Sequence, residues 1–333
     1  PYSKRSSSAI AVTTDGSTLL VVNPDSNSLT LVDTADHSIL AEIPVGTDPR
    51  TVTVDDAGQR AYVANRGSGS VSVVDLATSQ TITEVHVGYR PYGVVVSPSG
   101  GTLYVSDQGL HRLVTLDTAS LEILSSRPLA SRPSGLGLSP DGETLLVTHL
   151  LSSRITVHPT RSHTLYLPII ARGPESRDRH LQNPTGGLGR PISGNGLAVS
   201  TISLFPDSNL VQSVVFSPDG SMAYVPHTRS NSNNLALTFD TTVFPMVSLV
   251  DLSTGQHLLG QQIDLGTVDP PGVGLPFDAA LARDGSEIWF VNAASNDLSV
   301  VDLTRHQLVA HIEVGYNPRG VVLSPGGETA YVN

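Results

Sequence analysis

Arginine and histidine side chains recur at equivalent loop positions of this 333-residue chain and are its main candidates for chemistry. Four of the arginines stand beside a proline, and two directly follow a predicted strand: the set is Arg50, Arg66, Arg90, Arg132, Arg229 and Arg319. Clustered guanidinium groups recognise carboxylates, phosphates or an acidic protein surface. We expect these arginines to form one mouth for a ligand or partner. The alternative is that each pairs with an acid of the neighbouring repeat and only stabilises the fold.

Two histidines, His149 and His227, occupy the same position in neighbouring repeats. A pair of imidazoles can begin a metal site, and the third ligand would come from Asp107, His111 or an inserted segment. The alternative is that both are hydrogen-bonded loop residues. No His-x-x-x-His spacing is present, so this pair is only a weak candidate for a metal site.

Other catalytic signatures are missing from the sequence. No Gly-x-Ser-x-Gly elbow marks a nucleophile, and Gly186-Gly187-Leu188-Gly189 lacks the Lys-Ser/Thr of a phosphate loop. Aspartates end the third predicted strand of five repeats, which is too regular for one catalytic site: Asp33, Asp75, Asp117, Asp251 and Asp302. We expect them to accept hydrogen bonds from turn amides.

The composition removes several classes of function. Acidic residues outnumber basic ones by 30 to 19, a net charge of −11, which argues against nucleic acid as a partner. No run of 18 apolar residues predicts a membrane-spanning helix. The absence of cysteine excludes disulfides, thiol catalysis, iron–sulfur clusters and covalent haem within these residues, so we expect no cofactor here.

A repeat of 42 residues positions all of these side chains. Turn glycines stand at 16, 58, 100, 142, 220, 285 and 327, and four of the six intervals between them are 42 residues. Each repeat has an alternating apolar strand before the glycine, a second strand after it, a third ending in Asp and a fourth ending in Gly. The glycine itself permits a tight hairpin.

Seven units of four short strands predict one all-β domain over residues 1–333, a seven-bladed β-propeller with four-stranded antiparallel blades. An open β-solenoid and a two-sheet sandwich are the alternatives. Seven residues before the turn glycine, six of seven side chains are small, as expected near a crowded axis: Ala9, Thr51, Gly93, Gly135, Ser213, Asp278 and Gly320. The last repeat stops after two strands, so we expect that blade to be incomplete, with the ring closed by further native sequence or by another chain.

Two insertions interrupt the repeat, at about 159–196 and about 230–246. We expect both to lie outside the blade sheets as surface loops. The second falls between two strands whose connecting turn opens onto the arginine-bearing face.

Several segments resemble the YVTN-repeat propellers of bacteria and archaea, namely Ala61-Tyr62-Val63-Ala64-Asn65, Ser70-Val71-Ser72-Val73-Val74-Asp75 and Ser217-Pro218-Asp219-Gly220. A narrower resemblance, to YVTN propellers attached to dihaem cytochrome peroxidase-like domains, is carried by residues 225–231, 242–245 and 292–297. This resemblance implies an exported protein in the extracellular space, the periplasm or at the cell surface. It also implies that any haem-binding motifs lie beyond the propeller.

Two classes of function follow from the sequence. The first is a non-catalytic scaffold that docks a protein partner or a covalently linked domain, one that the resemblance suggests is cytochrome-like. The second is an enzyme, either as the propeller module of a c-type cytochrome oxidoreductase or as a lactonase-like or lyase-like propeller with a site in its own mouth.

Overall fold

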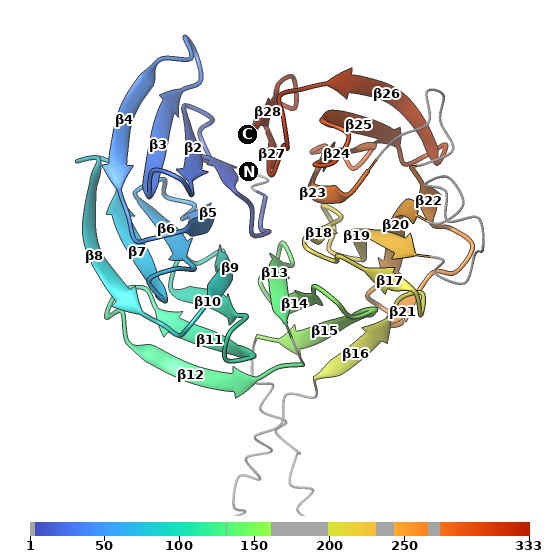
Figure 1. The fold of residues 1–333 in the computed structure, drawn as a ribbon, viewed down its shortest axis with the longest axis horizontal. Coiled ribbons are helices and arrows are strands. Elements are labelled where there is room, and N and C mark those ends of the chain that lie inside the picture. Colours follow the sequence, from blue (N-terminus) through green and yellow to red (C-terminus); the bar gives the residue numbers. More distant parts are fainter. Residues whose placement is uncertain (1–3, 131, 161–198, 231–242, 266–273) are drawn as a thin grey trace, which may run out of the picture.

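The chain forms a ring of antiparallel β-sheets around a central axis (Figure 1). This computed structural model describes residues 4–130, 132–160, 199–230, 243–265 and 274–333. All regular structure in these ranges is β, as predicted. Nothing in them forms a helix of the length and apolar character that a membrane span requires.

Five blades have four consecutive strands each, ordered from the axis outward. Blade 1 holds β1 (Ile10–Val12), β2 (Thr18–Asn23), β3 (Ser28–Asp33) and β4 (Ile39–Pro44). Blade 2 holds β5 (Pro49–Val54), β6 (Arg60–Asn65), β7 (Ser70–Asp75) and β8 (Gln80–His86). Blade 3 holds β9 (Pro91–Val96), β10 (Thr102–Asp107), β11 (Arg112–Asp117) and β12 (Ile123–Pro128). Blade 4 holds β13 (Pro133–Leu138), β14 (Thr144–His149), β15 (Arg154–Pro159) and β16 (Ser200–Ser203). Blade 6 holds β23 (Pro276–Leu281), β24 (Glu287–Asn292), β25 (Asp297–Asp302) and β26 (Gln307–Glu313).

Blade 5 has its first and fourth strands in two pieces. β17 (Ser208–Asn209) and β18 (Val215–Phe216) both pair with β19 (Met222–Ser230). β21 (Gln256–His257) and β22 (Ile263–Asp264) both pair with β20 (Val243–Asp251). A seventh sheet, between blades 6 and 1, contains only β27 (Val321–Leu323) and β28 (Ala330–Val332) among the described residues.

The expectation that both insertions lie wholly outside the sheets is wrong at the second one. The long hairpin β19–β20 continues to the pair Ser230↔Val243, so Ser230 and residues 243–246 belong to the blade. Residues that were expected to form a loop therefore lengthen both β19 and β20 beyond the equivalent strands of the other blades. At the first insertion Pro159 ends β15, and residues 161–198 lie outside the described residues, as do 231–242.

The turn glycines and the strand-ending aspartates do what their spacing predicted. All seven turn glycines have positive φ, between 64° and 84°, a conformation that other residues adopt only with strain. The aspartate side chains accept backbone N–H groups of the next turn, as Asp75 does from Thr78 at 2.8 Å and Asp251 from Ser253 at 2.8 Å. Each blade thus repeats one local hydrogen-bonded frame.

Neighbouring inner strands approach so closely at the axis that two blades need glycine there. A Cβ on Gly93 would stand 2.6 Å from the carbonyl oxygen of Ser134, and one on Gly135 would stand 2.0 Å from that of Gln212. Both distances are too short for real Cβ contacts. The run of small residues in the sequence therefore reflects backbone-to-backbone packing around the channel.

Seven hydrophobic clusters fill the ring, each between two sheets that are neighbours. The cluster between blade 1 and the seventh sheet is centred on Ile10, Leu19 and Val322. No single core serves all blades, and a further tie at the axis joins sheets that are not neighbours.

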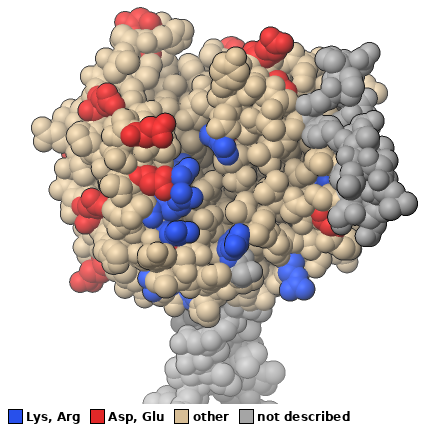
Figure 2. Space-filling model, viewed as in Figure 1, with Lys and Arg blue, Asp and Glu red and all other residues tan. Residues whose placement is uncertain are grey.

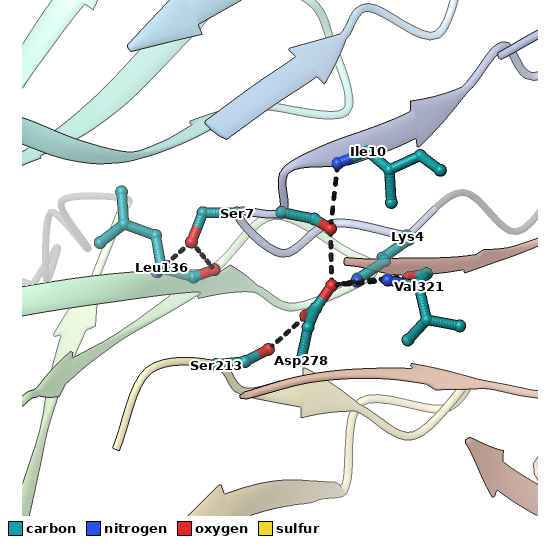
Figure 3. A network of polar contacts seen from close by, with 8 residues as sticks. Lys4, Ser7, Ile10, Leu136, Ser213, Asp278 and Val321 are labelled. Carbon is teal, nitrogen blue, oxygen red and sulfur yellow. Dashed lines mark hydrogen bonds and ion pairs between the residues drawn. The ribbon is translucent and has the colours of Figure 1, made fainter. Parts of the chain in front are cut away.

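The N-terminal segment supplies that tie by crossing the channel, as Figure 3 shows around Asp278. The Ser7 N–H donates to Leu136 O of blade 4 at 2.8 Å, and the Val52 N–H of blade 2 donates to Ser8 O at 2.8 Å. Lys4 Nζ donates to Asp278 Oδ2 of blade 6 at 2.6 Å and to Val321 O of the seventh sheet at 2.8 Å. Four segments that are distant in sequence are therefore joined through residues 4–8.

We predict that Asp278→Asn lowers the free energy of unfolding by about 3–5 kcal/mol, because it leaves the buried Lys4 ammonium without its counter-charge. The double variant Lys4→Met/Asp278→Asn should recover part of that loss, since the unpaired charge is gone. Urea denaturation followed by circular dichroism measures both, with the exposed Glu313→Gln in the same blade as control. A double variant that is less stable than Asp278→Asn would show that the ion pair between Lys4 and Asp278 does not hold the sheets together at the axis.

Candidate functional site at the arginine-bearing mouth

One end of the central channel opens into a cavity of about 90 Å³. Figure 2 shows a hollow at the centre of one face, with Lys and Arg side chains gathered around it and most acidic side chains further out. The cavity is lined from five blades, the seventh sheet and the N-terminal segment, by Ser7, Ser8, Ala9, Val22, Pro24, Arg50, Thr51, Tyr92, Gln212, Ser213, Phe277, Asp278, Arg319 and Asn333. Two of the six predicted mouth arginines, Arg50 and Arg319, belong to this lining.

The cavity is closed below by the N-terminal segment. Ser7, Ser8 and Asp278 belong to both its lining and the axial network. The Asp278 carboxylate is fully engaged there, with Oδ2 accepting from Lys4, Ser8 and the Val321 N–H, and Oδ1 accepting from Ser213. Its negative charge is matched by the Lys4 ammonium, so the floor is electrically balanced.

Arg50 and Arg319 bring two positive charges to the wall of the cavity. Arg319 stacks on the Phe277 ring, 4.4 Å from its centroid, and forms no ion pair within the described part of the chain. Burial lowers the pKa of Arg319, the field of Tyr92 opposes this shift, and the charge of Arg50 adds to it. Each guanidinium therefore lies in the field of the other, an arrangement that an anion between them would stabilise.

Three predicted mouth arginines form ion pairs with acids of their own face, and two of them share one carboxylate. Arg66 Nε lies 2.6 Å from Asp48 Oδ2, and Arg50 Nη2 lies 2.5 Å from the other oxygen of the same carboxylate. Arg229 pairs with Asp207 at 2.8 Å and covers the Phe205 ring at 4.1 Å. Arg66 and Arg229 thus pair with acids of their own blades rather than with acids of the neighbouring repeat.

Arg90 and Arg132 lie on the rim with no ion pair within the described ranges. Both side chains are exposed, and Arg90 stacks on Tyr89 at 5.5 Å. Hydrogen bonds join their loops into one arc. Gln108 N–H donates to Arg90 O within blade 3, and Arg132 N–H donates to His111 Nδ1 at 3.3 Å, which links the same blade 3 loop to blade 4. We call Tyr89, Arg90, Leu110, Arg132 and Leu151 the rim arc.

His149 and His227 are buried inside blades 4 and 5 and hold strands together. His149 Nε2 lies 3.1 Å from Thr156 Oγ1, and His227 Nε2 lies 2.9 Å from Ser248 Oγ. Asparagines at the same repeat position make the same contact in other blades, as Asn65 does to Ser72 at 2.9 Å and Asn292 to Ser299 at 2.9 Å. The described residues contain no group of three potential metal ligands, so a metal site at this pair stays a prediction.

Sequence reasoning missed the residues that build the floor, Lys4, Ser8 and Asp278. One signal was available: Asp278 is the only charged residue among seven otherwise small or neutral axial positions. Tyr92 was missed as well, because its hydroxyl reaches Gln212 Oε1 across the channel at 3.3 Å, a contact that no local spacing reveals.

Comparisons with known proteins place the fold. A family model described as "Lactonase, 7-bladed beta-propeller" matches residues 2–90, and no curated protein matches the chain in sequence. A chain of the Kuenenia stuttgartiensis hydrazine synthase superposes with a TM-score of 0.78 at 23% identity, covering 97% of this chain and 91% of that one. A functionally unknown protein from Desulfotomaculum acetoxidans DSM 771 gives a TM-score of 0.67 at 15% identity, with coverages of 98% and 88%. These similarities define the class as β-propeller; the resemblance to YVTN propellers with dihaem domains stays a prediction.

The buried histidines predict a loss of stability in acid. Burial lowers the pKa of His227 from 6.5 to about 4, and that of His158 likewise to about 4. The unfolded chain therefore takes up protons below pH 6.5 that the folded chain does not take up until about pH 4. The free energy of unfolding should fall across this window, by about 3 kcal/mol for His227 alone, and this contribution should not change further at lower pH.

His227→Asn tests this, because asparagine makes the equivalent contact in other blades but does not titrate. The variant should show a shallower fall in the free energy of unfolding between pH 6.5 and 4 than the wild type. His306→Asn, at an exposed turn, is the matched control and should follow the wild-type curve. Parallel curves for wild type and His227→Asn would contradict the assignment.

Proposed function

We propose that this chain is a non-catalytic binding module that docks an acidic protein partner on its arginine-bearing mouth. The observation that carries the proposal is the presence of three guanidiniums at one end of the channel, Arg90, Arg132 and Arg319, without an ion-pair partner among the described residues. They stand on a chain of net charge −11. Such a local positive field concentrates acidic partners.

The rim arc supports a protein rather than a small molecule as the docked partner. Tyr89 is 62% exposed, Leu110 53% and Leu151 56%, and they alternate with Arg90 and Arg132 along linked loops. Tyrosine and arginine are the residues most often responsible for binding energy at protein interfaces. We also infer that β27 and β28 are the inner half of a seventh blade. The resemblance to exported propellers favours an extracellular, periplasmic or surface location.

A fluorescein-labelled hexaglutamate peptide tests the docking proposal. Its binding, measured by fluorescence anisotropy, should weaken about five-fold at low salt in Arg90→Gln/Arg132→Gln, because exposed charges contribute modestly. Binding by the wild type should also weaken from 0.01 M to 0.15 M salt, since the Debye length shrinks from about 30 Å to about 8 Å. Arg305→Gln, on the outer part of blade 6, is the control. Equal loss in the control, or no binding of hexaglutamate by the wild type, would contradict docking at the rim.

Hydrolysis of a lactone is the second candidate, favoured by the family-model match over residues 2–90. The cavity contains a hydroxyl–carboxylate pair, since Ser8 Oγ donates to Asp278 Oδ2 at 2.6 Å. Arg50 and Arg319 lie on the same wall and would stabilise an oxyanion. If this candidate holds, the wild type hydrolyses a simple lactone in a pH-indicator assay, and Ser8→Ala loses the activity while its circular dichroism spectrum at the assay temperature remains that of the folded wild type. Equal rates of lactone hydrolysis with and without the protein would exclude this candidate function.

A further inference from the structure

We propose that the cavity at the channel mouth binds a single carboxylate group between Arg50 and Arg319. This inference deepens the proposed docking function and rests on the same arginine-bearing mouth. It names a site below the rim with its own residues. The carboxylate can arrive on a free short-chain organic acid or on an acidic side chain of a docked partner.

The size of the cavity limits what enters it. Its volume is about 90 Å³, whereas an engineered cavity of about 150 Å³ admits benzene. The N-terminal segment closes the bottom, so a ligand enters from the arginine face. A carboxylate with a short substituent fits this space, and a larger group would remain on the rim.

The charges of the cavity favour an anion. Asp278 is balanced by Lys4, and Arg50 shares Asp48 with Arg66. Arg319 lacks a carboxylate in the described ranges, which leaves the wall positive. Arg50 Nε is buried without a hydrogen-bond partner, and an unmade hydrogen bond of this kind destabilises the empty site.

The shape of the guanidinium groups favours a carboxylate over a spherical anion. Planar guanidiniums bind carboxylates with two parallel N–H···O bonds. Phe277 holds the Arg319 plane by stacking, and the paired Asp48 holds Arg50. Tyr92 lines the cavity from blade 3 and adds no negative charge, because burial raises its pKa. Val22, Pro24 and Phe277 offer an apolar wall to a methyl or ethyl substituent.

Acetate and propionate are the probes, titrated into the full chain in a buffer free of other carboxylates and of phosphate. Saturation-transfer NMR on the methyl protons should give an affinity of about millimolar, the level expected for a ligand of four or five atoms. Arg319→Gln and Arg50→Gln should each weaken binding about ten-fold. Arg319→Lys, which keeps the charge but not the planar fork, should weaken it less than Arg319→Gln.

Three results would overturn the inference. The first is no binding of acetate by the wild type at an acetate concentration 50-fold above the expected dissociation constant of about 1 mM. The others are unchanged acetate binding in both arginine variants, and tighter binding of phosphate than of acetate. The rim variant Arg90→Gln/Arg132→Gln is the matched control and should bind acetate normally. A wild-type protein that binds acetate but not hexaglutamate would show failure of the docking proposal alone. The reverse result points to failure of the cavity site alone. Thermal melts confirm that each variant is folded.

Discussion

A single buried carboxylate at the axis organises the ring. Asp278 accepts hydrogen bonds from Lys4 and Ser8 of the N-terminal segment, from Ser213 of blade 5 and from the backbone of Val321 in the seventh sheet. These groups come from opposite ends of the chain. Because hydrophobic clusters connect only neighbouring sheets, this network is what joins distant parts of the ring to one another. A buried charge is tolerated at this point because both carboxylate oxygens accept hydrogen bonds and an ammonium balances the charge.

The fold was predictable because it repeats. A spacing of 42 residues between turn glycines identifies hairpins, and the alternation around them identifies strands, without any knowledge of tertiary structure. The same repetition explained Gly93 and Gly135 at the axis and His149 and His227 at strand ends, once their equivalents in other blades were compared. Features that break the repeat escaped: the long hairpin β19–β20, the split outer strand of blade 5 and the N-terminal segment in the channel. Residues 4–8 pair across more than 120 positions of sequence with blade 4, and no local pattern encodes such a pairing.

The six predicted arginines divide according to their neighbours in space, which the sequence did not specify. Asp48 pairs with both Arg50 and Arg66, and Asp207 pairs with Arg229, so Arg66 and Arg229 stabilise loops while Arg50 keeps part of its charge at the cavity. Arg90 and Arg319 stack on aromatic rings, Arg132 donates its backbone N–H to the His111 ring, and none of the three pairs with an acid in the described ranges. An aromatic ring holds a guanidinium in place without cancelling its charge. Stacking therefore keeps the positive field at the mouth, whereas an ion pair would remove it.

The structural tie and the electrostatics of the mouth depend on each other. An ionised Asp278 at the bottom of the cavity, without Lys4, would repel an anion bound above it. Lys4 removes that repulsion by pairing with Asp278, and it also helps to close the channel. It lies on the far side of Asp278, where it lines a second, smaller hollow toward the opposite face. The ammonium is therefore shielded from the mouth, where Arg50 and Arg319 provide the positive charge. A ring closed only at its perimeter would leave the channel open to water at both ends. Because the N-terminal segment crosses the axis, the cavity is instead closed at its bottom and open at the mouth, with a neutral floor and a positive wall.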